Sequence, residues 1–210
     1  MKKIMFKDRF GLTQAVLEGR KTMTRRLVKS DNIVSITTSD GAVHHVDKTF
    51  GSYHEYMDKD GKVWLAWSPY KVGEVVAVAQ CYEDIWKQIV DGEAHASQCY
   101  KFYREHQSSA GWNNKMFVRA DIMPHYIRIT NIKVEQLQDI TDWECLAEGI
   151  VRVDLQVVGH ETLYSTNNNP AYFYGDSART AFATLIDKIN GKGTWERNPW
   201  VFVYTFKIID

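Results

Sequence analysis

Short β-type runs recur along most of this 210-residue chain, and helices do not follow them in regular alternation. The runs at 75–80, 126–137 and 200–208 are rich in β-branched and aromatic residues, which is typical of strands. Rossmann and TIM-barrel folds need strands that alternate regularly with helices, so the pattern disfavours both. It predicts an α+β fold, in which a small mixed sheet curls into a partial barrel with a few short helices at its periphery.

Three stretches carry the signals of helix ends. Residues 11–19 place their apolar side chains on one face and finish at a glycine. Thr141 and Glu144 match a capping box, in which two side chains satisfy free backbone N–H groups, so a helix is expected to begin there. Asp176 precedes a longer helical periodicity over 177–190 and is expected to cap that helix.

Three segments interrupt this plan, near 29–68, 81–115 and 151–175. The first contains two Asp-Gly turn signals between β-type runs, which predicts one or two inserted hairpins rather than a linker. The second contains a short helical pattern near 85–90, and residues 116–120 after it are typical of a short strand. We therefore expect one domain over residues 1–210 with three insertions.

The composition excludes several classes of protein. Lysine and arginine number 26, as do aspartate and glutamate, so neither a histone-like protein nor an acidic tail is expected. The hydrophobic fraction of 44% and the charged fraction of 25% are those of a globular domain. No signal-peptide pattern or long apolar stretch is present, which predicts no contact with a membrane. The three cysteines stand far apart, which favours the reducing cytoplasm over a disulfide framework.

Two motifs that suggest a cofactor or a metal do not have the required spacing. The run Gly191-Lys192-Gly193-Thr194 lacks both the earlier glycine and the adjacent hydroxyl of a phosphate-binding P-loop. His44, His45 and His54 lack a second ligand pair at zinc-site spacing. We predict neither a metal nor a cofactor.

The segment from Arg20 to Lys29 holds five basic residues and no acidic one. In a chain that is neutral as a whole, such a segment concentrates positive charge at one place and attracts anions there. Phosphate or nucleic acid is the expected partner. The alternative is a solvated basic turn that follows a helix.

Glu148 occupies an unfavourable position in the last turn of the helix that begins after Thr141. A carboxylate there faces the negative end of the helix dipole, at a cost of up to roughly 1 kcal/mol. The side chain is therefore either exposed or held by a cation, for which Lys21 or a neighbouring arginine is the candidate.

The run Leu-Glu-Gly-Arg-Lys-Thr-Met-Thr-Arg-Arg at 17–26 resembles the Gly-x-Lys signature of the ASCH domain family, a relative of the PUA fold. Further blocks resemble phage and prophage members of that family in the same order, at 69–76, 117–124, 128–150 and 191–201. The resemblance implies a PUA-like mixed β-barrel with peripheral helices and a cleft beside the Gly-x-Lys turn. It also implies a protein directed at a nucleoside or RNA.

One small enzyme of the ASCH family hydrolyses the amide of N(4)-acetylcytidine with a lysine, a threonine and a glutamate. The resemblance assigns these roles to Lys21, Thr24 and Glu148. Thr24 would be the nucleophile and Lys21 its base, with the two sharing one face of a helical turn, while Glu148 holds the lysine or shuttles a proton. Four further residues are expected to bind substrate or phosphate: Arg20, Arg25, Arg26 and Tyr70.

Two other functions remain open on the sequence. The same basic turn serves equally well in a non-catalytic module that binds RNA or a nucleotide. In a phage accessory protein that binds another protein, the turn is purely structural. Only the amidohydrolase requires the hydroxyl of Thr24.

Overall fold

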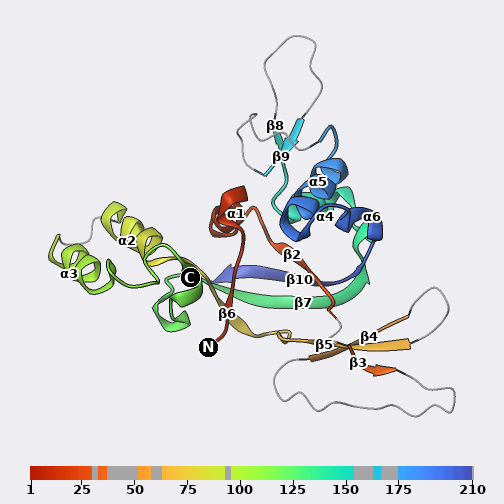
Figure 1. Cartoon of the computed structure of the whole chain (residues 1–210), viewed down its shortest axis with the longest axis horizontal. Coiled ribbons are helices and arrows are strands. Elements are labelled where there is room, and N and C mark those ends of the chain that lie inside the picture. The colour runs from red at the N-terminus through yellow and green to blue at the C-terminus, as the bar shows by residue number, and fades with distance from the viewer. Residues whose placement is uncertain are drawn as a thin grey trace, which may run out of the picture.

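The computed structural model describes residues 1–29, 33–36, 52–57, 63–92, 96–153, 163–166 and 175–209. A five-stranded sheet forms the centre of the fold (Figure 1). Its strands, from one edge to the other, are β1 (Lys3–Ile4), β6 (Val75–Val78), β7 (Tyr126–Gln136), β10 (Trp200–Ile209) and β2 (Met23–Leu27). β1 pairs in parallel with β6, and the other pairs are antiparallel.

The mixed sheet and its separate helices confirm the α+β class. The five-stranded sheet is open, so the closed PUA-like barrel is not confirmed. Its edges are β1 and β2, which do not pair with each other. Beside β1, the guanidinium of Arg26 on β2 donates to the carbonyl of Met5 at 2.5 Å, where a closed barrel would have a backbone ladder. The bend expected near Thr130 is present, because the register of β7 against β10 shifts between Thr205 and Phe206.

Two smaller sheets lie on opposite sides of the central one, at the bottom and at the top of the view in Figure 1. The first consists of β3 (Ile33–Ile36), β5 (Val63–Ser68) and β4 (Ser52–Met57), paired in that order. The consecutive strands β4 and β5 pair antiparallel, which confirms one hairpin in the first insertion, and β3 pairs with the other edge of β5. The two Asp-Gly turns lie outside the described residues. The second sheet pairs β8 (Val151–Val153) with β9 (Leu163–Ser165).

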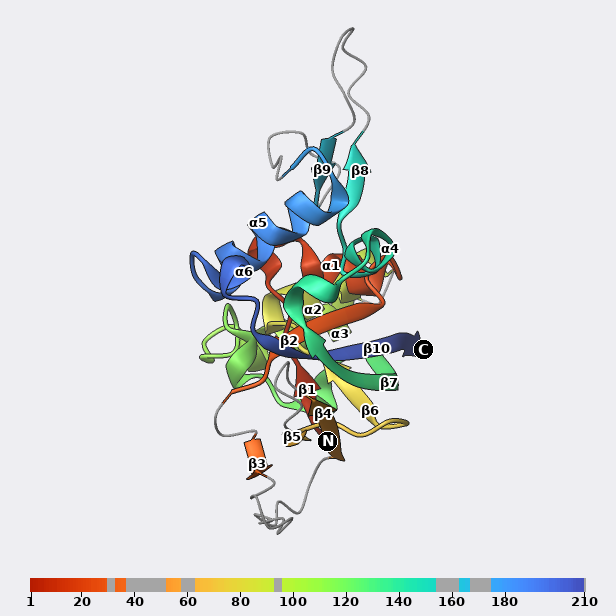
Figure 2. The same ribbon diagram turned by 90° about the vertical axis from the view of Figure 1, so that its right-hand side faces the viewer.

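Helices cover one face of the central sheet (Figures 1 and 2). They are α1 (Leu12–Leu17), α4 (Asp142–Ala147), α5 (Ala178–Asn190) and the short α6 (Thr194–Arg197). The predicted capping box begins α4, with Thr141 as the N-cap and Glu144 as its partner. The N-cap of α5 is Ser177 rather than Asp176, because the Ser177 hydroxyl accepts a hydrogen bond from the backbone N–H of Thr180. Asp176 accepts only from the side-chain hydroxyl of Thr180.

The second insertion is more helical than the sequence indicated. It contains α2 (Tyr82–Asp91) and α3 (Ala96–His106), which pack together over a small core of their own. The expected strand at 116–120 is wrong, since the chain there forms two 3₁₀ turns, Lys115–Phe117 and Ala120–Ile122. The ammonium of Lys3 donates to three carbonyls of residues 115–118 and holds them in a turn that cannot pair as a strand.

Two further 3₁₀ turns, Asp8–Phe10 and Leu137–Asp139, connect the elements of the main core. That core lies between the helices and the sheet, and its largest fully buried side chains include Tyr204, Phe182 and Phe202. None of the helices in the described ranges is long and apolar enough to cross a membrane.

Candidate functional site

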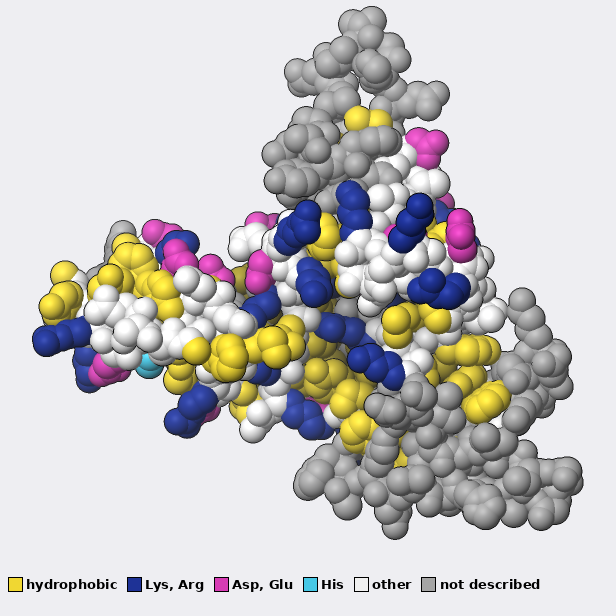
Figure 3. Space-filling model, viewed as in Figure 1, with side chains coloured by type: hydrophobic (Ala, Val, Ile, Leu, Met, Phe, Trp, Pro, Cys, Tyr) yellow, Lys and Arg dark blue, Asp and Glu magenta, His cyan; other side chains and the backbone are white. Residues whose placement is uncertain are grey.

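A cavity of about 760 Å³ opens between β2, α5 and the N-terminal segment. Figure 3 shows lysine and arginine side chains gathered around a hollow at the centre of this face, with hydrophobic side chains between them. Its lining includes six of the seven site residues that the sequence singled out: Lys21, Thr24, Arg25, Arg26, Tyr70 and Glu148.

The turn after α1 places Lys21 and Thr24 at this cavity. Gly19 adopts φ +72°, which lets the chain reverse after the helix. The backbone N–H of Lys21 then donates to Ala15 and that of Thr22 to Ala147, which directs the chain into β2. The expected helical turn is therefore wrong: Lys21 precedes β2 and Thr24 lies within it.

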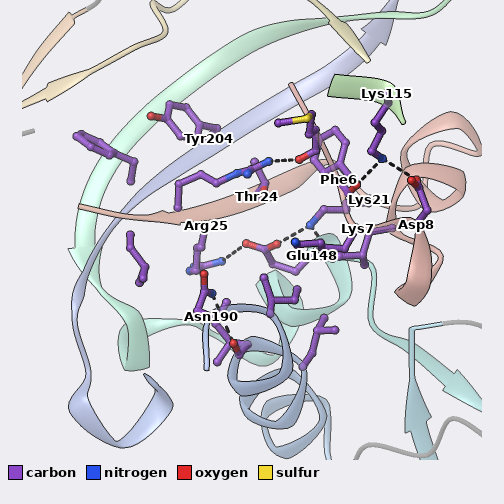
Figure 4. A pocket seen from close by; sticks show the side chains of 18 of the residues that line it. Phe6, Lys7, Asp8, Lys21, Thr24, Arg25, Lys115, Glu148, Asn190 and Tyr204 are labelled. Carbon is purple, nitrogen blue, oxygen red and sulfur yellow. Dashed lines mark hydrogen bonds and ion pairs between the residues drawn. The ribbon is translucent and has the colours of Figure 1, made fainter. Parts of the chain in front are cut away.

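Lys21 and Glu148 form a buried ion pair, with side chains only 2% and 5% exposed. The Lys21 ammonium donates to the carboxylate of Glu148 at 2.5 Å, to its carbonyl at 2.7 Å and to the carbonyl of Met23 at 2.7 Å. Glu148 is the C-cap of α4, and of the two alternatives left open by the sequence the structure shows the second, in which a cation holds this carboxylate against the helix dipole. Figure 4 shows Glu148 between Lys21 and Arg25.

Arg25 is surrounded by carboxylates and has no exposed side-chain surface. Its guanidinium lies 2.6 Å from Glu135, 3.0 Å from Glu144 and 3.3 Å from Glu148. Lys133 completes the cluster through ion pairs with Glu135 at 2.5 Å and Glu144 at 2.9 Å. Although Arg25 lines the cavity, carboxylates of the protein already neutralise its charge. An arginine that binds the phosphate of a ligand would instead be without such partners.

Burial and charge act in opposite directions on Lys21. Burial lowers its pKa below the ordinary value, the Glu148 carboxylate opposes that shift, and Arg26 and Arg25 add to it. Each of the three N–H groups of the ammonium has an acceptor, so this geometry fits the charged form. A proton that moves across the short contact to Glu148 leaves a neutral amine beside a neutral acid.

Thr24 is only 5% exposed, yet its hydroxyl makes no hydrogen bond within the described ranges. It pairs in register with Tyr204 on β10, so the two side chains share one face of the sheet. The side chain of Arg25 leaves β2 on the opposite face. Because β2 is an edge strand, the cavity reaches residues of both faces.

The other expected ligand-binding residues are placed differently from one another. Arg26 is exposed and lines the cavity. Tyr70 also lines it, and its ring packs edge-on against Tyr204 with centroids 5.3 Å apart. Arg20 is not part of the lining and forms a surface ion pair with Glu18 at 2.5 Å.

The glycine-rich run at 191–194 serves the start of α6. The carboxylate of Asp187 accepts hydrogen bonds from the backbone N–H groups of Gly193 and Trp195. These N–H groups are therefore not available to bind a phosphate. In the described part of the chain, no three histidine, cysteine, aspartate or glutamate side chains are grouped so that they could hold a metal ion.

Sequence reasoning missed Lys133, Glu135 and Glu144 as parts of the buried cluster. A signal was present, since residues two apart on a strand share a face and Lys133 and Glu135 are so spaced on β7. No protein-family model matches the sequence, and neither curated proteins nor solved structures include a match to it.

Proposed function

We propose that this cavity binds a nucleoside or a base of an RNA, and that Lys21, Thr24 and Glu148 hydrolyse an amide on that base. The observation that carries the proposal is that an unpartnered hydroxyl on a largely buried residue, Thr24, and a buried Lys–Glu pair line one cavity. Buried ionisable groups with shifted pKa values are concentrated at catalytic sites. The family resemblance points to N(4)-acetylcytidine as the simplest substrate.

The size and lining of the cavity suit such a ligand. Small-molecule sites commonly measure about 300–1,000 Å³ and combine apolar walls with a few polar groups. Phe6, Phe202 and Tyr204 form a buried apolar wall here, and the half-buried ring of Tyr70 offers a base a partly exposed aromatic face. Stacking of a base on one such ring contributes roughly 1–3 kcal/mol.

In the proposed reaction, the Oγ of Thr24 bonds to the acyl carbon while its proton passes to the neutral amine of Lys21. That amine forms when the ammonium gives a proton to Glu148, 2.5 Å away. The carbon–nitrogen bond then breaks, and the amino group of cytidine takes up the proton. Water hydrolyses the threonine ester to acetate and regenerates the hydroxyl, so one amide and one water give one amine and one acid.

A binding module without chemistry is the second candidate, and two observations favour it. The Lys21 ammonium already has three acceptors, so it must release one before it can act on Thr24. Thr24 also leaves β2 on the face opposite Arg25, which contacts Glu148. A pocket that only binds a base needs neither group to move.

The test is to incubate the purified protein with N(4)-acetylcytidine and measure cytidine by chromatography. We expect cytidine from the wild-type protein and none above background from Thr24→Val, Lys21→Met or Glu148→Gln. Thr22→Val is the matched control, because Thr22 precedes the same strand and does not line the cavity. Calorimetric titration with cytidine separates the candidates: an inactive wild-type protein that binds cytidine is a binding module.

A further inference from the structure

The charges around the cavity are unevenly balanced. Six cationic side chains line it against two carboxylates, in a chain whose formal net charge is zero. Lys21 and Arg25 are neutralised by buried carboxylates, and Lys115 is paired with Asp8 at 2.7 Å. Among the other cations of the lining, Lys7 and Arg26 form no ion pair with a described carboxylate and contribute to the excess of positive charge.

Arg26 carries part of this excess and has no carboxylate partner among the described residues. One of its nitrogens donates to the carbonyl of Met5 at 2.5 Å, which leaves the other N–H groups of the guanidinium available. Lys7 forms no ion pair or hydrogen bond with side chains of the described ranges, and Figure 4 shows it reaching into the cavity from the N-terminal segment. Both residues are exposed, so a ligand has access to them.

The strand register places Arg26 close to the proposed nucleophile, Thr24. Arg26 and Thr24 are two residues apart on β2 and share one face, opposite Phe202 and Tyr204 on β10. The rings of Phe202 and Tyr204 lie 6.0 Å apart, centre to centre. A hydroxyl and an unneutralised guanidinium therefore lie on one face within about 7 Å of strand length, above a wall formed by two buried rings.

From this arrangement we propose that Arg26, assisted by Lys7, forms a phosphate subsite, so that the ligand of the cavity is a nucleotide rather than a neutral nucleoside. The inference rests on the proposed function for the base and adds the phosphate. Arginine suits this role because its planar fork matches the oxygens of a phosphate with two parallel hydrogen bonds. Arg20 and Arg25, which the sequence also suggested for phosphate, are each paired with carboxylates of the protein.

The test compares cytidine with cytidine 5′-monophosphate by calorimetric titration at low ionic strength. We expect the monophosphate to bind at least tenfold more tightly than cytidine, and its affinity to fall with added salt while that of cytidine does not. Arg26→Ala should weaken binding of the monophosphate much more than binding of cytidine and so remove most of this preference. Arg26→Lys should restore part of it, and Lys7→Ala should have a smaller effect. Lys207→Ala is the control, because Lys207 is an exposed cation on β10 outside the cavity lining.

Equal affinity of the wild-type protein for the two ligands overturns the phosphate subsite, as does an Arg26→Ala protein that keeps the preference. Failure to bind either ligand overturns it together with the nucleoside function. Hydrolysis of N(4)-acetylcytidine without any phosphate preference refutes the subsite alone. A phosphate preference without hydrolysis supports the subsite and refutes only the chemistry.

Discussion

Removal of one partner from the buried pair is expected to destabilise the whole domain. In Glu148→Ala, the Lys21 ammonium keeps two backbone carbonyls but loses the carboxylate at 2.5 Å, and its side chain is only 2% exposed. An uncompensated buried charge of this kind costs about 3–5 kcal/mol of unfolding free energy. Urea denaturation followed by circular dichroism measures that loss as a lower midpoint at an unchanged slope.

The double variant Lys21→Met with Glu148→Ala separates the charge effect from the loss of packing. Neither charge is then left without its partner. We therefore expect the double variant to lose about 0.5–3 kcal/mol less unfolding free energy than the sum of the losses in the two single variants. Asp121→Asn is the matched control, since Arg119 and Asp121 are also 2.5 Å apart but lie on the surface, and its midpoint should not move. Single variants that lose less than about 1 kcal/mol, or losses that simply add, would refute the account of the pair.

Three further predictions follow from other contacts. Burial raises the pKa of Glu144, but hydrogen bonds from Thr141 and Lys133 and the charge of Arg25 outweigh burial and lower that pKa below its usual 4.5. The stabilisation provided by the ionised Glu144 is therefore complete above pH 4.5 and is lost as the pH falls below that value. Urea midpoints measured against pH should show this loss in the wild-type protein and much less of it in Glu144→Gln. Arg25→Lys loses the fork that contacts three carboxylates, so we expect a lower kcat for N(4)-acetylcytidine at an unchanged KM, and a rise in KM alone would show that Arg25 binds substrate instead. An added Cβ in Gly111→Ala meets the ring of Tyr82 at 2.5 Å, which is expected to cost about 1–3 kcal/mol, and an unchanged thermal midpoint would contradict that packing.

The parts of the fold that the sequence predicted well are those governed by local interactions. The capping box at Thr141 correctly marked the start of α4, because cap and partner are three residues apart. The helix dipole then made Glu148 an anomaly that needed a cation, and Lys21 was among the candidates although it lies 127 residues away. Both inferences depend on backbone groups within one helix.

The strand order was not predictable in the same way. The open sheet depends on which edges pair, and a side-chain contact from Arg26 to Met5 occupies the gap that a barrel would close. The buried cluster depends on β10, where Val203 pairs with Arg25 on one side and with Lys133 on the other. That alignment brings together charges more than 100 residues apart, which no local pattern reports.

The strand predicted at 116–120 failed for a related reason. Its apolar residues fit a strand locally, but the Lys3 ammonium takes the carbonyls of Lys115, Met116 and Val118, and the side chain of Asn114 caps the turn. Met116 and Phe117 remain exposed rather than packed in a sheet. Tertiary contacts from the N-terminus therefore override a weak local preference.

The release of cytidine from N(4)-acetylcytidine by the wild-type protein and by Thr24→Val tests the central claim most directly. We expect cytidine and acetate in equal amounts from the wild-type protein, and from Thr24→Val binding of cytidine but no hydrolysis of N(4)-acetylcytidine. Release at the same rate by both proteins would show that the Thr24 hydroxyl takes no part. Absence of release from the wild-type protein would contradict the proposed hydrolysis.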